Sequence, residues 1–329
     1  MSFEDSTVAL ANLADVDDVP MTPAGHHTPA DRVFRGLSTA AACVSLLIIG
    51  GTLIFLIDRA RPAFKSSGIW DFFTTSVWNP ATGRFGVLGL LEGTLIIAAI
   101  AMVLAVPLAV GMALFINEYA PVRIRRILTT MVDLLAALPS LLFGIWVLKS
   151  LQRHLAPVAN FLDHHLSVLP FMHVKDNAPL TGSAFIAGVT VALMILPIIT
   201  SVTRDVMAQV PREQCEGALA LGGTRWGMIR SVILPFSRGG IVGASILGFG
   251  RALGETIAVA LIISPIIGVN THILEGGASS IASHIAVHFG EATPVERSGL
   301  IAAGLALFLL TFAVSFAARF IVARKAVKA

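Results

Sequence analysis

Arg251 and Glu255 are the side chains in this sequence whose types and spacing are best suited to chemistry. They lie four residues apart in an apolar run, residues 239–263, with Arg251 at its midpoint. Residues with this spacing share one face of a helix, and an arginine at the centre of a bilayer costs roughly 2.5–3.5 kcal/mol on insertion scales. The guanidinium would give an anion in transit a positive site, because its planar fork of donors matches phosphate-type oxygens.

Glu255 would keep this anion site from binding too tightly. Its carboxylate could also accept the proton-bearing oxygen of hydrogen phosphate, which sulfate does not offer. The alternative interpretation is a buried ion pair that only orders the helix bundle. Glycines flank the pair at four-residue spacing, which allows close helix packing within the chain or against a second subunit across a central pathway.

Weaker candidates for the same pathway lie in two other apolar runs. Thr94 stands near the start of one run, and Ser140 follows Pro139 in another, where a helix break would present its hydroxyl to a pathway. Asp133 also lies in an apolar run, and we expect it to pair with Arg126 or with another basic residue on the inner side.

Six apolar runs must position these residues. The chain is 55% hydrophobic and only 13% charged, whereas an average soluble domain is about 25% charged. A helix needs roughly 20 residues to cross a bilayer, and alternating strands typical of a barrel are not visible. The prediction is an all-α polytopic membrane protein with six transmembrane helices, at about residues 39–57, 87–116, 127–148, 183–202, 239–263 and 299–322.

Prolines are expected to distort three of these helices. Pro107 would tilt or kink the second, and Pro139 and Pro197 would interrupt the third and fourth. The basic residues predict the orientation, because placing both termini in the cytoplasm puts the larger share of Lys and Arg on the inner side. Their scatter among apolar spans argues against nucleic-acid binding.

The remaining segments are predicted to carry no chemistry of their own. Residues 1–30 are acidic and contain no Lys or Arg, which indicates a disordered acidic cytoplasmic tail, followed by a transmembrane domain at 31–329. Four histidines lie in the outer loop at 149–182, but their spacing matches no common metal site, so we expect none. Cys43 and Cys215 fall in distinct regions, so we expect no disulfide.

A polar loop at about residues 204–238 lies between the fourth and fifth runs. It reads Glu216-Gly217-Ala218, three residues, Gly222, nine residues, then Val232-x-Leu234-Pro235. This spacing is similar to the coupling loop of bacterial ABC-importer permeases, whose pattern is Glu-Ala-Ala, three residues, Gly, nine residues, Ile-x-Leu-Pro. In this chain Gly217 replaces one Ala of the pattern, and Val232 replaces the Ile.

Nearly the whole chain after residue 30 resembles the C-type permease subunit of the bacterial phosphate-specific ABC importer. The motifs that carry the resemblance are Trp78-Asn79-Pro80 with Phe85-Gly86, Gly93-Thr94, Leu138-Pro139-Ser140 with Gly144, the coupling loop, and Gly250-Arg251-Ala252-Leu253-Gly254-Glu255-Thr256. The resemblance implies an ABC type I importer permease fold in the bacterial inner membrane, with Arg251 and Glu255 taking part in transport.

The resemblance also implies an assembly. A related A-type permease would complete a heterodimer, an ATPase homodimer would dock on the cytoplasmic coupling loop, and a phosphate-binding protein would dock outside. The coupling loop would transmit ATP-driven closure to the spans, with Gly222 as its turn and Pro235 ending its second part. Because the sequence has no Gly-Lys dipeptide and hence no P-loop, the partner ATPase would bind ATP and Mg, and this chain would be no enzyme.

Two other functions remain open at this point. One is an importer permease for another oxyanion, molybdate or sulfate. The other is a secondary transporter or channel that works alone, although the inverted repeat typical of such proteins is not evident.

Overall fold

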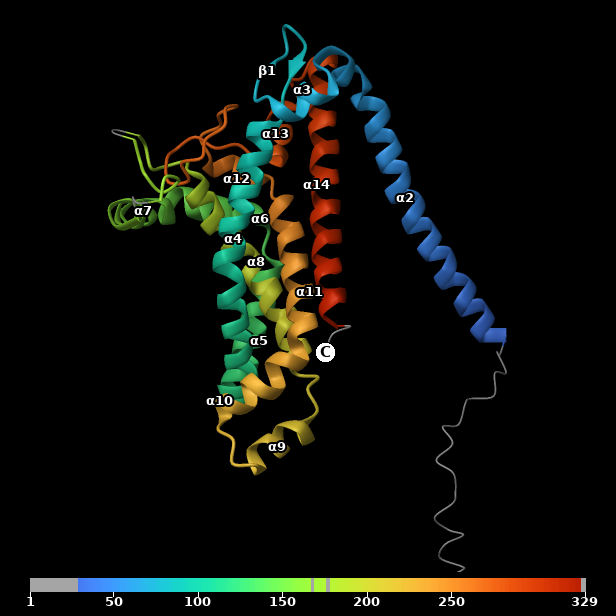
Figure 1. Cartoon of the computed structure of the whole chain (residues 1–329), viewed down its shortest axis with the longest axis vertical. Helices are drawn as coiled ribbons and strands as arrows, with labels where there is room; N and C mark the ends of the chain where they lie inside the picture. Colours follow the sequence, from blue (N-terminus) through green and yellow to red (C-terminus); the bar gives the residue numbers. More distant parts are fainter. Residues whose placement is uncertain (1–28, 167–168, 176–177, 327–329) are drawn as a thin grey trace, which may run out of the picture. The chain divides into compact units, whose positions relative to one another are not determined.

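The computed structural model describes residues 29–166, 169–175 and 178–326. The disordered tail predicted at 1–30 lies outside the described residues up to residue 28 and stays a prediction there, while Pro29 and Ala30 belong to a helix. The chain divides into two compact units, Met1–Leu53 and Ile54–Ala329. Helix α2, Pro29–Ser67, crosses the boundary between them. The second unit contains all the candidate site residues and is helical through most of its length (Figure 1).

The elements of the second unit follow one another in a simple order. After α2 they are α3 Ile69–Thr74, β1 Trp78–Asn79, β2 Arg84–Phe85, α4 Leu88–Leu114, η1 Phe115–Tyr119, α5 Val122–Ala137, α6 Ser140–Trp146, η2 Val147–Leu151, α7 Gln152–Leu166, α8 Ala184–Met207, α9 Arg212–Ala220, α10 Arg225–Met228, η3 Ile229–Ile233, α11 Leu234–Leu253, α12 Ile257–Ile262, α13 Ile281–His288 and α14 Pro294–Ala326. The η elements are π-helical turns.

The predicted count of spans is confirmed approximately. Among the described residues, five helices are long and apolar enough to cross a membrane, and a bent pair, α5 with α6 and the helix that follows it, raises the number to six. The pair bends by 93°, so the predicted interruption of the third span by Pro139 is confirmed. Leu138 and Pro139 are extended at the bend, because proline disfavours helical backbone in the residue before it and lacks an N–H of its own.

Two further expectations about helix breaks are corrected. The fifth run is not one helix over 239–263, since α11 ends at Leu253 and α12 begins only at Ile257. Pro197, in contrast, does not interrupt α8, which continues through it. Most of α8 is buried inside the protein. The helices packed around it allow it to tolerate the loss of the hydrogen bond that Pro197 cannot make.

Small side chains bring α4, α8 and α11 close together. On α4 the fully buried residues Ala98, Ala101, Ala105 and Ala109 recur every three or four positions, which forms one stripe of a helix. On the facing side, a Cβ at Gly248 of α11 would lie 2.6 Å from the Ile199 side chain of α8, so a larger residue there would force that side chain to move. These three helices form the main core of the second unit.

The motif Trp78-Asn79-Pro80 with Phe85-Gly86 forms a hairpin. Trp78 pairs with Phe85 and Asn79 with Arg84 in antiparallel register. The Asn79 side chain accepts a hydrogen bond from the backbone N–H of Ala81 at 3.0 Å, an arrangement that favours a turn. The Trp78 ring packs edge-on against His284 of α13 at 4.7 Å between centroids, so the hairpin and α13 are held together.

Candidate functional site

Two helix breaks place the predicted pathway residues around one groove. Ser140 starts α6 directly after the Pro139 break, and Arg251, Glu255 and Thr256 surround the break between α11 and α12. These residues line an open groove of about 420 Å³. The structure therefore brings together three of the four predicted pathway residues and adds Thr256, which belongs to the sequence motif but was not singled out.

Arg251 and Glu255 do not form the ion pair that their spacing suggested. No nitrogen–oxygen distance between them is within 4.0 Å among the described residues. The reason is local: α11 ends at Leu253 and Gly254 is its C-cap, so the four-residue spacing no longer places both side chains on one helical face. The interpretation as a bundle-ordering ion pair is therefore wrong.

Glu255 is held instead by the helix that follows it. Its side chain is buried, with 8% of its surface exposed, and its Oε1 atom accepts from the backbone N–H of Ala258 in the first turn of α12 at 3.4 Å. Its other oxygen has no hydrogen bond to a described residue. Arg251 is exposed and makes no hydrogen bond or ion pair with the described residues, so its donors are free to meet an anion in the groove.

Thr94 lies apart from this groove. It is buried, donates to the carbonyl of Leu90 at 2.6 Å and accepts from the backbone N–H of Ile281 at 3.0 Å. Its hydroxyl thus ties α4 to the start of α13, and both hydrogen bonds satisfy polar groups that would otherwise be buried alone. The structure gives no contact between Thr94 and the other predicted pathway residues.

The coupling loop contains a defined helix terminus at Gly222. Helix α9 ends there with a backbone φ of +83°, which glycine adopts without strain. The N–H of Gly223 donates to the carbonyl of Ala218, and the N–H of Gly222 donates to the carbonyl of Leu219. These two hydrogen bonds form a Schellman motif, which explains the spacing between Ala218 and Gly222 and confirms the predicted turn.

The second part of the coupling loop is continuous with the fifth span. Thr224 caps α10 by accepting from the N–H of Gly227 at 3.1 Å, and the helix then runs without a break through η3 into α11. The prediction that Pro235 ends this part is wrong. In η3 the N–H of Leu234 donates to Ile229, five residues back, and this wider turn lets the chain pass a proline that lacks an N–H.

The coupling loop packs on one side and is exposed on the other. Cys215 and Ala218 lie against a buried cluster that includes Met207, Met228 and Ile233. Burial, and then the charges of Glu118 and Glu216, raise the pKa of the Cys215 thiol.

The opposite side of the loop offers large apolar side chains to solvent. Leu221 is 91% exposed and Trp226 is 59% exposed, and Glu216, Gly217 and Gly222 are also exposed. Single exposed apolar residues are common, but these two flank the turn at Gly222 in the sequence, which makes them candidates for contact with a docking partner.

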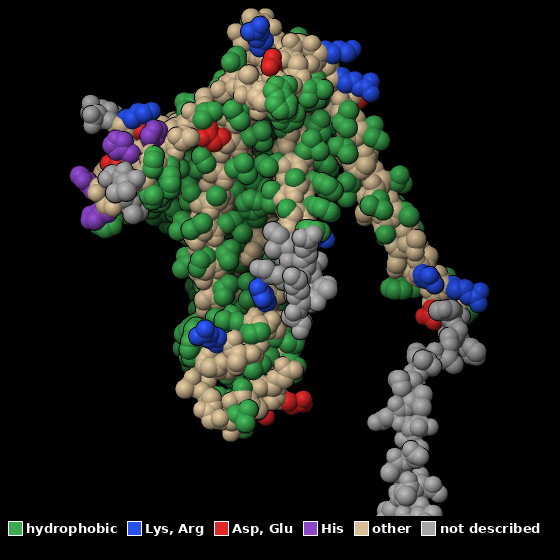
Figure 2. Space-filling model, in the orientation of Figure 1, with side chains coloured by type: hydrophobic (Ala, Val, Ile, Leu, Met, Phe, Trp, Pro, Cys, Tyr) green, Lys and Arg blue, Asp and Glu red, His purple; other side chains and the backbone are tan. Residues whose placement is uncertain are grey.

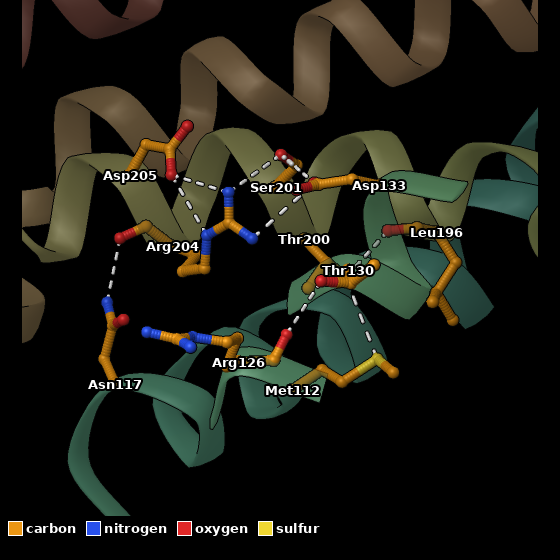
Figure 3. A network of polar contacts seen from close by, with 10 residues as sticks. All are labelled: Met112, Asn117, Arg126, Thr130, Asp133, Leu196, Thr200, Ser201, Arg204 and Asp205. Carbon is orange, nitrogen blue, oxygen red and sulfur yellow. Dashed lines mark hydrogen bonds and ion pairs between the residues drawn. The ribbon is translucent and has the colours of Figure 1, made fainter. Parts of the chain in front are cut away.

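A polar network joins α8 to α5 and η1 near the coupling loop (Figure 3). The Arg204 guanidinium lies 3.6 Å from Asp133 and also bonds Asp205 and Ser201. Asn117 donates to the carbonyl of Arg204 at 2.8 Å. Asp133 therefore pairs with Arg204, as the expectation of an inner-side basic partner allowed, and not with Arg126.

Comparison with known proteins decides the family. A family model described as "Binding-protein-dependent transport system inner membrane component" matches residues 105–327, more than half of the chain. The chain belongs to this family.

Curated relatives agree with this membership over nearly the whole length. "Phosphate transport system permease protein PstC 2" of Mycobacterium tuberculosis is 42% identical over 313 residues, which cover 93% of this chain and 95% of the relative. The PstC protein of Mycobacterium leprae is 40% identical, with 88% and 92% covered. The PstC protein of Xylella fastidiosa strain 9a5c is 37% identical, with 90% and 91% covered.

Solved structures support the fold of this inner membrane component. A bacterial ABC transporter that imports the acidic polysaccharide alginate matches with a TM-score of 0.57 at 18% identity, covering 89% of this chain and 99% of the other. The same kind of transporter in complex with its periplasmic protein matches with a TM-score of 0.59 at 15% identity, covering 90% and 95%. The chain therefore has the fold of an ABC importer permease, as predicted.

Sequence reasoning missed parts of this permease that depend on distant contacts. Asn117 and Arg204 are 87 residues apart in sequence, and Asn117 stands just after the end of the second apolar run, so nothing local pointed to this partner. The histidines of segment 149–182 contact nearby groups: His165 stacks on Phe161, and His173 lies 3.7 Å from Asp163. Among the described residues, no cluster of three potential metal ligands occurs.

Proposed function

We propose that this chain is the transmembrane subunit of an ATP-driven importer of inorganic phosphate and forms half of the translocation pathway. The observation that carries the proposal is the groove lined by Ser140, Arg251 and Glu255. Among the described residues, its guanidinium has no acidic partner and one oxygen of its carboxylate has no hydrogen-bond donor, and the groove also offers a hydroxyl. The names of the curated relatives support phosphate as the substrate.

Hydrogen phosphate fits these three groups better than other oxyanions do. Arg251 can bind two phosphate oxygens through its planar donor fork, and Ser140 can donate to an oxygen or accept from a phosphate hydroxyl. The Glu255 carboxylate, an acceptor only, repels a fully ionised anion but accepts a hydrogen bond from a protonated one. Sulfate and molybdate carry no such proton at neutral pH, so Glu255 favours phosphate over both.

The coupling loop would connect this pathway to an ATPase. Glu216, Gly217, Ala218, Gly222, Leu234 and Pro235 are the residues that we assign to this coupling. Because the helix from Arg225 to Leu253 is continuous, a force on the loop acts on the turn that contains Arg251. A rigid-body rotation of this kind is one of the established ways to switch a protein between two states.

The proposed assembly contains three kinds of partner. A related A-type permease would provide the other half of the pathway, an ATPase homodimer would bind the coupling loop from the cytoplasm, and an extracytoplasmic phosphate-binding protein would deliver the substrate. ATP and Mg would be bound by the ATPase. Both termini of this chain would then lie in the cytoplasm, with the chain in the bacterial inner membrane.

Uptake by the reconstituted complex tests this proposal. Proteoliposomes that contain all the partners should accumulate radiolabelled phosphate only when ATP is supplied, and excess sulfate or molybdate should not compete. Competition by either anion at the concentration of phosphate would favour a permease for another oxyanion. Uptake by this chain alone, with no nucleotide consumed, would instead identify a secondary transporter.

A further inference from the structure

Arg251 also lines a second, larger groove. This groove measures about 780 Å³ and lies between α8, α11 and α14, and its other polar side chains are Ser315 and Arg319. We propose that Arg319 and Ser315 form a second oxyanion-binding site, which exchanges phosphate with Arg251. The inference rests on the proposed function and extends it to residues of α14.

The charges around the second groove suit a doubly charged anion. Two guanidinium groups line it, and no carboxylate does so among the described residues. Neither Arg251 nor Arg319 makes an ion pair or hydrogen bond with a described residue. Two unpaired like charges that face one cavity repel each other, and an anion that binds there relieves this repulsion.

Ser315 adds a hydroxyl that is available to the groove. Many serines and threonines in these helices donate to the carbonyl four residues earlier, as Ser245 does to Ile241 at 2.8 Å. Ser315 makes no hydrogen bond to a described residue. Its hydroxyl can therefore donate to a phosphate oxygen or accept from a phosphate hydroxyl, while a guanidinium supplies the charge.

Glycines keep the second groove open. Gly243 and Gly250 of α11 both line it, and a Cβ at either position would meet no atom within 4 Å. They therefore do not serve close packing inside this chain, unlike Gly248, whose Cβ would meet Ile199. The stretch of α11 from Arg251 back to Gly243 is roughly 12 Å long and runs toward the coupling loop. The second groove therefore extends from Arg251, which it shares with the first groove, toward the coupling loop.

Neutral and charged replacements of Arg319 test the proposal in the assembled importer. Arg319→Gln should lower phosphate uptake roughly tenfold or more, the effect of losing one charge-assisted hydrogen bond, with normal assembly. Arg319→Lys should keep part of the uptake.

Arg123→Gln, which removes an exposed arginine of α5 outside both grooves, is the matched control and should transport normally. Wild-type uptake by Arg319→Gln would overturn the proposal, as would loss of assembly in both Arg319 variants.

Chemical restoration of the charge separates a phosphate contact from a packing role. With Cys43→Ala and Cys215→Ala in the background, Arg319→Cys should regain uptake after reaction with the cationic reagent 2-aminoethyl methanethiosulfonate. The anionic 2-sulfonatoethyl reagent should not restore it. Recovery with both reagents, or with neither, would overturn the proposal.

The Arg251→Gln variant distinguishes this inference from the proposed function. If Arg251→Gln loses uptake while Arg319→Gln does not, only the proposal of a second oxyanion-binding site is wrong. If Arg251→Gln transports phosphate normally, the proposed function of the first groove fails as well.

Discussion

The backbone N–H of Gly223 donates to the carbonyl of Ala218 at 3.2 Å, and this hydrogen bond closes the end of α9 around Gly222. A Cβ at Gly222 would meet no atom within 4 Å, but its φ of +83° is strained for other residues. The side chain that replaces glycine therefore acts through the backbone and not through a clash.

Two substitutions at Gly222 should differ in their effect on coupling. Gly222→Val should uncouple phosphate uptake from ATP hydrolysis while the spans stay folded, because a β-branched residue costs about 1–2 kcal/mol in this conformation. Gly222→Asn should retain most of the coupling, since asparagine tolerates a positive φ. The ratio of phosphate transported to ATP hydrolysed is the measurement. Equal ratios for Gly222→Val and the wild type would count against the assignment of the loop.

Replacing Arg251 should stop transport without preventing assembly. Its guanidinium is exposed to two grooves and has no acidic partner among the described residues, so Arg251→Gln leaves no buried charge unpaired. Phosphate uptake and co-purification of the subunits are measured together. A complex that fails to form would show that Arg251 is needed for packing.

Arg251→Lys is the matched variant for this position. It keeps the charge but loses the planar fork, so uptake should fall at low phosphate and recover partly at high phosphate. Identical kinetics for Arg251→Lys and the wild type would show that only the charge matters.

Changing Glu255 should alter selectivity more than folding. Glu255→Gln keeps the oxygen that accepts from the N–H of Ala258 and removes the negative charge that repels fully ionised anions. Sulfate should therefore compete with phosphate for uptake in this variant. The sulfate concentration that halves phosphate uptake should be about tenfold lower than in the wild type, the equivalent of one charge-dependent hydrogen bond. An unchanged competition curve would remove Glu255 from the selectivity mechanism.

The stability of the hairpin region should depend on pH through His284. Helix α13 is not among the candidate spans, and its His284 is 5% exposed beside Trp78 and His288. Burial, and then the neighbouring His288, lowers the pKa of His284 from 6.5 to about 4. The unfolded chain therefore binds a proton at a higher pH than the folded chain does.

This difference in pKa sets the direction of the effect. The stability due to neutral His284 is complete above pH 6.5 and is lost as the pH falls toward about 4, by roughly 3 kcal/mol in total. His284→Phe keeps a ring against Trp78 but cannot be protonated, so its thermal unfolding should vary less over this range. His154→Phe, at an exposed ring of α7, is the control and should follow the wild type. Parallel curves for His284→Phe and the wild type would contradict the assignment.

Local features of the sequence predicted the elements well. Apolar runs of sufficient length located the helices, the Gly222 spacing predicted a turn that the backbone confirms, and Pro139 predicted a break that is present. Each of these follows from a few neighbouring residues, through hydropathy, the conformational freedom of glycine or the missing N–H of proline.

Only the tertiary structure decided which polar groups share an environment. The end of α11 at Leu253 removes Arg251 and Glu255 from a shared helical face. Arg319, which follows Arg251 by 68 positions in the sequence (319 − 251), lines the second groove with it from α14. Sequence spacing describes one helix at a time, whereas a groove is made by helices far apart along the chain. The sequence by itself therefore determined the helices and their charged residues, and the packing of α8, α11 and α14 decided where those charges meet.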